Sequence, residues 1–331
     1  MNVRRPHISA AALAAVTALG LGTLTACSSD SAAAGDSDKF DVVASFYPMA
    51  FLAERIGGEH VSVTSLTEPG QEPHDLEISA KQTAQLEESD AALYLKGLQP
   101  SVDEAIGQSP VETKIDAATL TSLEEHGTEA GGHEEEHSEE EHSEEEHSEE
   151  EHGHEHEGGK DPHIWLDPVK YAEVAEGVGK AFEKADPDHA ADYRKNTAAL
   201  VGELNELDEK FETGLADKKN SVFITTHAAF GYLAERYGLT EEAISGLDPE
   251  TEPSGARVKE LQEMAKADGV TTVFYETLVS DKTAKTLAGD TGLKTDVLDP
   301  VEGITDASRG DDYFQVMEAN LKALQAALGT K

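Results

Sequence analysis

The chain has 331 residues, one cysteine and a formal net charge of −41 at pH 7. Its length is enough for two domains of ordinary size. The negative charge argues against nucleic acid or anionic lipid as a partner and suits the attraction of cations, although acidic faces that only keep an exported protein soluble would give the same surplus. The single cysteine, Cys27, excludes an internal disulfide.

Residues 1–26 are expected to form a signal peptide. Arg4 and Arg5 precede an apolar stretch at residues 8–24 that is too short and too lightly flanked for a stable membrane span. The sequence LTAC that ends at Cys27 resembles the lipobox of bacterial lipoproteins. This resemblance implies cleavage before Cys27 and a lipid on its thiol, with plain secretion as the alternative. The small, polar residues 27–39 then form a flexible spacer.

Residues 40–185 are expected to form an N-terminal lobe in which short β-rich runs alternate with helical segments. Strands are predicted at residues 41–46, 61–66, 91–95 and 113–116. Helices are predicted at residues 48–56, 79–89 and 168–184.

A tract rich in Glu and His interrupts this lobe. Residues 124–157 contain 17 Glu and 8 His, with no Lys or Arg, and repeat the sequence EEEHS. Such a composition cannot bury enough apolar surface to fold, so we expect a disordered loop over residues 124–158. Its side chains can bind a divalent metal such as zinc, with an acidic linker as the alternative. The expected auxiliary weak ligands are His126, His133, His137, His142, His147, His152, His154 and His156.

A long helix at residues 186–216 is expected to link two lobes, because one apolar stripe runs along it. Residues 217–331 resume the alternation and form the expected C-terminal lobe. Its predicted elements are strands at 221–226, 271–274 and 295–298, and a last helix at 312–328. The whole pattern predicts an α/β fold of two lobes, each a parallel sheet with flanking helices, joined by one rigid helix.

Three histidines outside the tract lie in distinctive surroundings. His74 follows a predicted strand in the sequence EPHDLE, His163 lies in DPHIWLDP, and His227 follows a strand in THAAFGYL. Ligands gather at the carboxyl ends of strands in open α/β sheets, where Asp299 of the sequence VLDP also lies. Each histidine alone could be a surface or core residue. Together they predict a shared metal site.

These motifs resemble the zinc-binding receptors of bacterial ABC importers, the ZnuA-like members of the TroA-type (cluster A-I) lipoproteins. The resemblance covers the chain from Val42 to the C-terminus. It implies that His74, His163 and His227 bind the metal between the two lobes, with Asp299 at the position of a fourth carboxylate. If the three imidazoles share one ion, their rings must lie within about 8 Å of one another.

The ligand types favour zinc, because three imidazoles and one carboxylate suit its four-coordinate, nitrogen-rich sites. Manganese prefers more oxygen, and the manganese receptors of this family resemble the zinc ones but carry a carboxylate at the third position, where this chain has His227. Glu77 and Glu276 are candidates for orienting the imidazoles from outside the coordination shell.

We therefore expect a high-affinity, extracytoplasmic zinc receptor, monomeric and tethered to the membrane by its lipid alone. Its expected partners are an ABC permease and the associated ATPase. The alternatives are a manganese receptor, a lipid-anchored zinc store or chaperone, and a zinc hydrolase. The chain has no nucleophile elbow and no phosphate-binding glycine loop, so we expect no catalytic residue.

Overall fold

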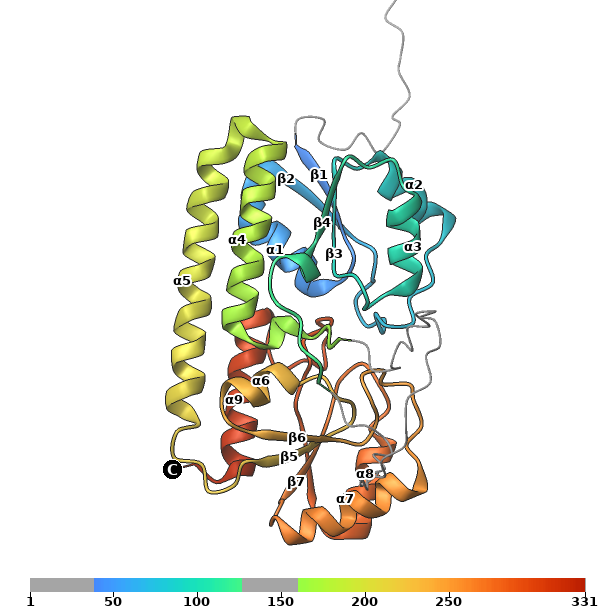
Figure 1. The fold of residues 1–331 in the computed structure, drawn as a ribbon, viewed down its shortest axis with the longest axis vertical. Helices are drawn as coiled ribbons and strands as arrows, with labels where there is room; N and C mark the ends of the chain where they lie inside the picture. Colours follow the sequence, from blue (N-terminus) through green and yellow to red (C-terminus); the bar gives the residue numbers. More distant parts are fainter. Residues whose placement is uncertain (1–38, 127–159, 331) are drawn as a thin grey trace, which may run out of the picture. The chain divides into compact units, whose positions relative to one another are not determined.

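The computed structural model describes residues 39–126 and 160–330, which all belong to one compact unit. Two parallel four-stranded sheets, each flanked by helices, organise this part of the chain (Figure 1). The predicted fold class is therefore confirmed, whereas the exact domain boundaries stay a prediction. Within the described residues, no helix combines the length and the apolar character that crossing a membrane requires.

The first sheet has the strand order β2-β1-β3-β4, with every neighbouring pair parallel. Its strands are β1 (Phe40–Ala44), β2 (Val61–Ser65), β3 (Ala91–Tyr94) and β4 (Thr113–Asp116). Its crossover helices are α1 (Tyr47–Gly57), α2 (Ala80–Glu88) and α3 (Pro100–Gln108). Residues 42–44 of β1 and 91–93 of β3 are apolar and buried, as expected for central strands that are covered on both faces.

Two long helices follow the first sheet and lie side by side in Figure 1. The first, α4 (Pro168–Ala185), begins where the Asp167 side chain accepts hydrogen bonds from the free N–H groups of the first turn. The second, α5 (Ala190–Gly214), is the predicted linker helix, and Leu200, Leu204, Leu207 and Phe211 are all buried along it. Short 3-10 turns precede the two helices, η3 (Ile164–Leu166) before α4 and η4 (Pro187–His189) before α5.

The second sheet repeats the topology of the first, with the order β6-β5-β7-β8 and only parallel pairs. Its strands are β5 (Val222–Thr225), β6 (Thr240–Ala243), β7 (Thr272–Tyr275) and β8 (Lys294–Val297). Its helices are α6 (Gly231–Arg236), α7 (Gly255–Ala267), α8 (Lys282–Thr291) and α9 (Tyr313–Leu328).

The predicted strands and helices are all present, with ends that differ from the predicted ones by at most four residues. The strands and helices for which no range is predicted are α3, α6, β6, α7 and α8. The edge strand β6 has the sequence TEEA, whose acidic residues hide the strand pattern. Helix α7 buries only Arg257, Leu261 and Ala265, so its apolar periodicity is weak.

A buried contact chain joins the segment at Trp165 to both sheets. The indole packs edge-on against Phe46, which follows β1, with ring centroids 5.0 Å apart. Its Nε1 donates a hydrogen bond of 2.7 Å to the carbonyl of Pro300, after β8, and its own carbonyl accepts one from the Tyr313 hydroxyl. These contacts hold the loops after β1 and β8 beside the segment that carries His163.

Candidate metal centre

His74, His163 and His227 converge although they lie far apart in the sequence. His74 is in the loop after β2, His163 immediately precedes η3, and His227 follows β5. The ring centroids are 5.4 Å apart for His74 and His163, 5.9 Å for His74 and His227, and 5.3 Å for His163 and His227. All three distances are within the 8 Å that a shared ion requires.

The carboxylate that lies among these rings belongs to Glu302, not to Asp299. The four residues His74, His163, His227 and Glu302 each offer a ligand atom, and these atoms lie within 4.8 Å of one another. One oxygen, Oε1 of Glu302, is 3.3 Å from Nε2 of His74, 3.4 Å from Nε2 of His163 and 3.6 Å from Nε2 of His227. The sequence interpretation placed the fourth carboxylate of the group at Asp299, and the structure places Glu302 there instead.

Asp299 instead shapes the turn that presents Glu302. Its Oδ1 accepts a hydrogen bond from the Val301 N–H at 2.8 Å, and its Oδ2 accepts one from the Thr277 hydroxyl. Val301 has φ of 60°, a left-handed conformation that β-branched residues rarely adopt. The Asp299 carboxylate therefore stabilises this turn of the chain. The turn places Glu302, three residues after Asp299, among the imidazoles.

Two buried carboxylates orient two of the imidazoles. Nδ1 of His227 donates to Glu276 at 2.9 Å, and Nδ1 of His163 donates to Asp161 at 2.8 Å. Both bonds fix the ring orientation and leave Nε2 free to bind a metal. The position expected for Glu276 is thus what the structure shows. Asp161 was missed, although it stands two residues before His163 in the quoted motif.

Glu77, the other candidate for this role, is exposed and makes no hydrogen bond to His74 in the described part of the chain. The carboxylate that contacts His74 from its own loop is Glu72, whose Oε1 accepts from the His74 backbone N–H at 3.0 Å. Burial, together with the negative charge of Glu302, raises the pKa of Glu72 to about 8. The acidic residue that contacts His74 in its own loop is therefore two residues before it, whereas Glu77 is three residues after it.

The residues present fit a bound divalent cation. Nε2 of His163, Nε2 of His227 and Oε2 of Glu302 are buried and have no hydrogen-bond partner. Polar atoms left in this state cost stability, so their convergence at one point calls for a ligand. Three imidazole nitrogens and one carboxylate oxygen match the donors of a four-coordinate zinc site.

The pKa shifts in the group favour a site in which a bound cation replaces protons on the imidazoles. Burial disfavours the imidazolium form, but the hydrogen bond to Asp161 and the nearby carboxylate of Glu302 raise the pKa of His163 to about 9. Burial likewise opposes the charge on His227, yet Glu276 and Glu302 raise its pKa well above the ordinary value. Against the effect of burial, the three nearby imidazoles lower the pKa of Glu302 well below its usual range.

Among the predicted auxiliary ligands, only His126 lies in the described residues, where its ring is bonded to Asp161 and Glu235. Outside the described residues lie His133, His137, His142, His147, His152, His154 and His156, and also the predicted lipidation site Cys27.

Comparisons with known proteins agree with this geometry. The family model for ZnuA, the periplasmic component A of the zinc-uptake complex, matches residues 42–327. The zinc-binding lipoprotein AdcA of Streptococcus pneumoniae (strain ATCC BAA-255 / R6) is 36% identical over 312 residues, which make up 91% of this chain and 58% of AdcA. The high-affinity zinc uptake system protein ZnuA of Bacillus subtilis (strain 168) is 35% identical over 328 residues, or 94% of this chain and 98% of that protein.

A solved structure has a similar fold. The crystal structure of the Zn(II)-bound ZnuA-like domain of Streptococcus pneumoniae AdcA has a TM-score of 0.69 and 33% sequence identity to this chain, and the match covers 88% of this chain and 99% of that domain. The chain spans little more than half of full-length AdcA but nearly all of the Bacillus subtilis protein. The chain belongs to the ZnuA family of zinc-uptake complex components.

Proposed function

We propose that this chain is an extracytoplasmic receptor that binds Zn²⁺ through His74, His163, His227 and Glu302 and delivers it to an ABC importer. The observation that carries the proposal is the convergence of buried, unpartnered ligand atoms on one point between segments from both halves of the chain. The names of the AdcA and ZnuA relatives, which refer to zinc binding and zinc uptake, support the choice of metal and of process.

Zinc rather than manganese is proposed because three of the four donors are imidazole nitrogens. A receptor rather than a hydrolase is proposed because four protein donors complete a tetrahedral shell, whereas catalytic zinc sites keep one position open for water. The proposed partners are a permease and its ATPase, and the proposed attachment to the membrane is a lipid on Cys27 of a monomeric protein. A zinc store would have the same site, but zinc-limited cells that lack it would still import zinc.

The test is metal analysis of the purified protein after chelation and reloading with zinc. The variants His74→Ala, His163→Ala, His227→Ala and Glu302→Gln should each lose the tightest bound equivalent. His60→Ala is the matched control, because His60 stacks on His189 at the surface, away from the site. A ligand variant that retains the tightest equivalent as His60→Ala does would contradict the assignment of that residue.

We further propose that the His/Glu-rich tract collects zinc weakly and passes it to the tight site. Deleting residues 127–157 should leave the tightest equivalent intact while it lowers the total zinc capacity and slows loading at scarce zinc. Unchanged capacity and loading rate in the deletion variant would refute this role.

A further inference from the structure

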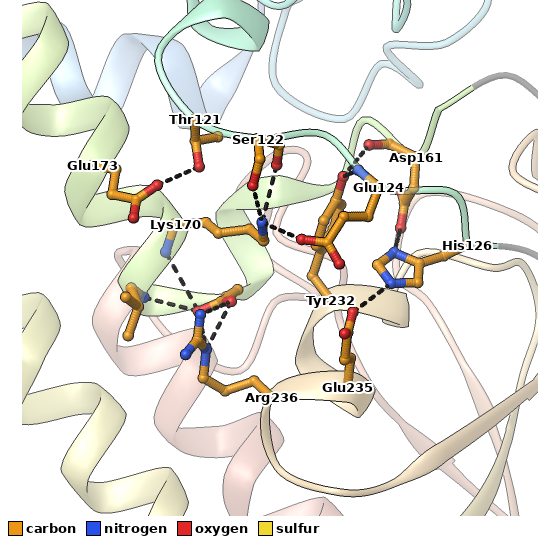
Figure 2. Close-up of polar contacts among 12 residues, drawn as sticks. Thr121, Ser122, Glu124, His126, Asp161, Lys170, Glu173, Tyr232, Glu235 and Arg236 are labelled. Atoms are coloured by element: carbon orange, nitrogen blue, oxygen red, sulfur yellow. Dashed lines mark hydrogen bonds and ion pairs between the residues drawn. The ribbon is translucent and has the colours of Figure 1, made fainter.

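Helix α6 contacts both ends of the segment that carries His163. At one end, the Tyr232 hydroxyl donates a hydrogen bond of 2.8 Å to the carbonyl of Asp161. At the other end, Nε of Arg236 donates to both carboxylate oxygens of Asp167, each at 2.8 Å, and its Nη2 lies 2.6 Å from Oδ2. Tyr232 and Arg236 are four residues apart and therefore lie on one face of this helix (Figure 2).

The segment depends on these contacts because its own backbone contains little regular structure. Residues 161–167 are all buried and include a single 3-10 turn, η3. Asp161 orients the His163 ring through Nδ1, so a movement of Asp161 moves that imidazole with it. Asp167 accepts a hydrogen bond from the Val169 N–H in the first turn of α4. The guanidinium of Arg236 therefore fixes the end of the segment at the point where α4 begins.

The same helix is joined to the loop that carries His227. Only residues 228–230 separate His227 from the start of α6. The Glu241 carboxylate on β6 accepts a hydrogen bond from the Phe230 N–H at 3.0 Å and one from the Thr225 hydroxyl at 2.7 Å. These two bonds lie on either side of His227 in the sequence and hold its loop against β6. The loop then leads directly into the helix that contacts the His163 segment.

We propose that Tyr232 and Arg236 are positioning residues, which together form a clamp on residues 161–167 and keep His163 at a metal-binding distance from His227 before zinc arrives. The rings of these two histidines are 5.3 Å apart. A receptor whose ligands are already in place loses less binding free energy to ordering them, so the clamp raises the zinc affinity without contacting the ion. The proposal rests on the proposed function, because it concerns binding at the same zinc site.

The expected loss of affinity follows from the fraction of metal-free molecules in which His163 is in place. Zinc binding weakens by the same factor by which this fraction falls. The Arg236–Asp167 pair is bidentate and charge-assisted, which makes it one of the stronger contacts that a side chain can form. If its removal lowers the fraction to about one-tenth, zinc binding weakens about 10-fold.

The experiment compares Arg236→Met and Tyr232→Phe with the wild-type full-length chain. Competition with a chromophoric zinc chelator gives the zinc affinity, and urea unfolding of the metal-free protein gives its stability. Hydrogen exchange of residues 161–167, with and without zinc, reports how well the segment is held. The matched controls are Arg194→Met, which removes an ion pair between the opposite end of α4 and α5, and Tyr193→Phe, which removes a buried tyrosine's hydrogen bond to a carboxylate.

We expect zinc binding to be about 10-fold weaker in Arg236→Met, weaker by a smaller factor in Tyr232→Phe, and unchanged in both controls. Hydrogen exchange of residues 161–167 should be faster than in the wild type in metal-free Arg236→Met and should return to the wild-type rate with zinc, because the ion then holds His163.

A purely structural contact would lower the stability in urea and leave the zinc affinity of the folded protein unchanged. That result in either variant would overturn the proposal, and so would an equal loss of affinity in the controls. A wild-type chain that binds no tight equivalent of zinc would instead refute the proposed function.

Discussion

Replacing Glu276 with Gln tests how much the zinc affinity depends on the orientation of His227. Oε1 of Glu276 accepts hydrogen bonds from Nδ1 of His227 at 2.9 Å and from the Thr226 hydroxyl at 2.5 Å, and the residue is 3% exposed. Glutamine has the same shape, and its oxygen can accept the same two bonds. The substitution therefore removes the charge while it keeps the geometry.

The expected magnitude depends on pH in a defined direction. Loss of an outer-shell partner of a metal-binding imidazole typically weakens binding about 10- to 100-fold, or about 1.4 to 2.7 kcal/mol. Burial opposes protonation of His227, but Glu276 raises its pKa well above the ordinary value, so zinc must displace a proton from the wild-type ring at neutral pH. Without Glu276 that pKa falls and less proton competes. The loss in affinity should therefore be smallest near pH 7 and should grow as the pH rises.

The assay is competition with a chromophoric zinc chelator at several pH values from 7 to about 9. Glu260→Gln is the matched control, since it makes the same chemical change on an exposed side chain of α7 that pairs with Arg257. Equal zinc affinities of the two variants at every pH would refute the orienting role. A loss that shrinks as the pH rises would refute the proton competition.

Three further predictions concern the turn, the core and the protons of the site. Asp299→Ala leaves the Val301 N–H without its partner, so the free energy of unfolding in urea should fall by about 1 to 3 kcal/mol and zinc binding should weaken. An unchanged zinc affinity would contradict the role of this turn. Trp165→Phe removes the hydrogen bond to the Pro300 carbonyl, so the free energy of unfolding, measured by circular dichroism in urea, should fall by about 1 to 3 kcal/mol. An unchanged free energy of unfolding would show that this bond does not stabilise the fold. Because the pKa of His163 is raised to about 9, zinc binding at pH 7 should release protons, and the affinity should increase as the pH rises toward 9. Calorimetry in buffers of different ionisation enthalpy measures this proton release. No release would show that the imidazoles of the metal-free protein are neutral.

The sequence could predict the three histidines because their signal is local. His74 follows β2 of the first sheet and His227 follows β5 of the second, each on the carboxyl side of its strand, and His163 lies in a distinctive motif. The two parallel sheets and the long helix α5 could be predicted for a similar reason, since apolar periodicity and strand alternation need no knowledge of tertiary contacts. Polar elements such as β6 carry no such signal.

The fourth ligand could not be predicted from strand position alone. Asp299 and Glu302 both follow β8, are three residues apart and are both buried. Which carboxylate reaches the imidazoles depends on the left-handed conformation of Val301, and a β-branched residue gives no sequence signal for positive φ. The same holds for Asp161, whose role follows from a ring orientation that appears only in three dimensions.

The buried charges explain why a site this acidic can hold together without metal and still bind it. At a pH below the raised pKa values of His163 and His227, the carboxylates of Asp161, Glu276 and Glu302 face two imidazolium rings, so one negative charge remains among these five groups. When zinc replaces the two imidazolium protons, its double charge faces the same three carboxylates and again one negative charge remains. The exchange therefore leaves the net charge of a low-dielectric site unchanged, which avoids the large cost of burying an unpaired charge. A monovalent ion that displaced the same protons would leave an additional negative charge buried, so the arrangement favours a divalent cation before any preference for imidazole is considered.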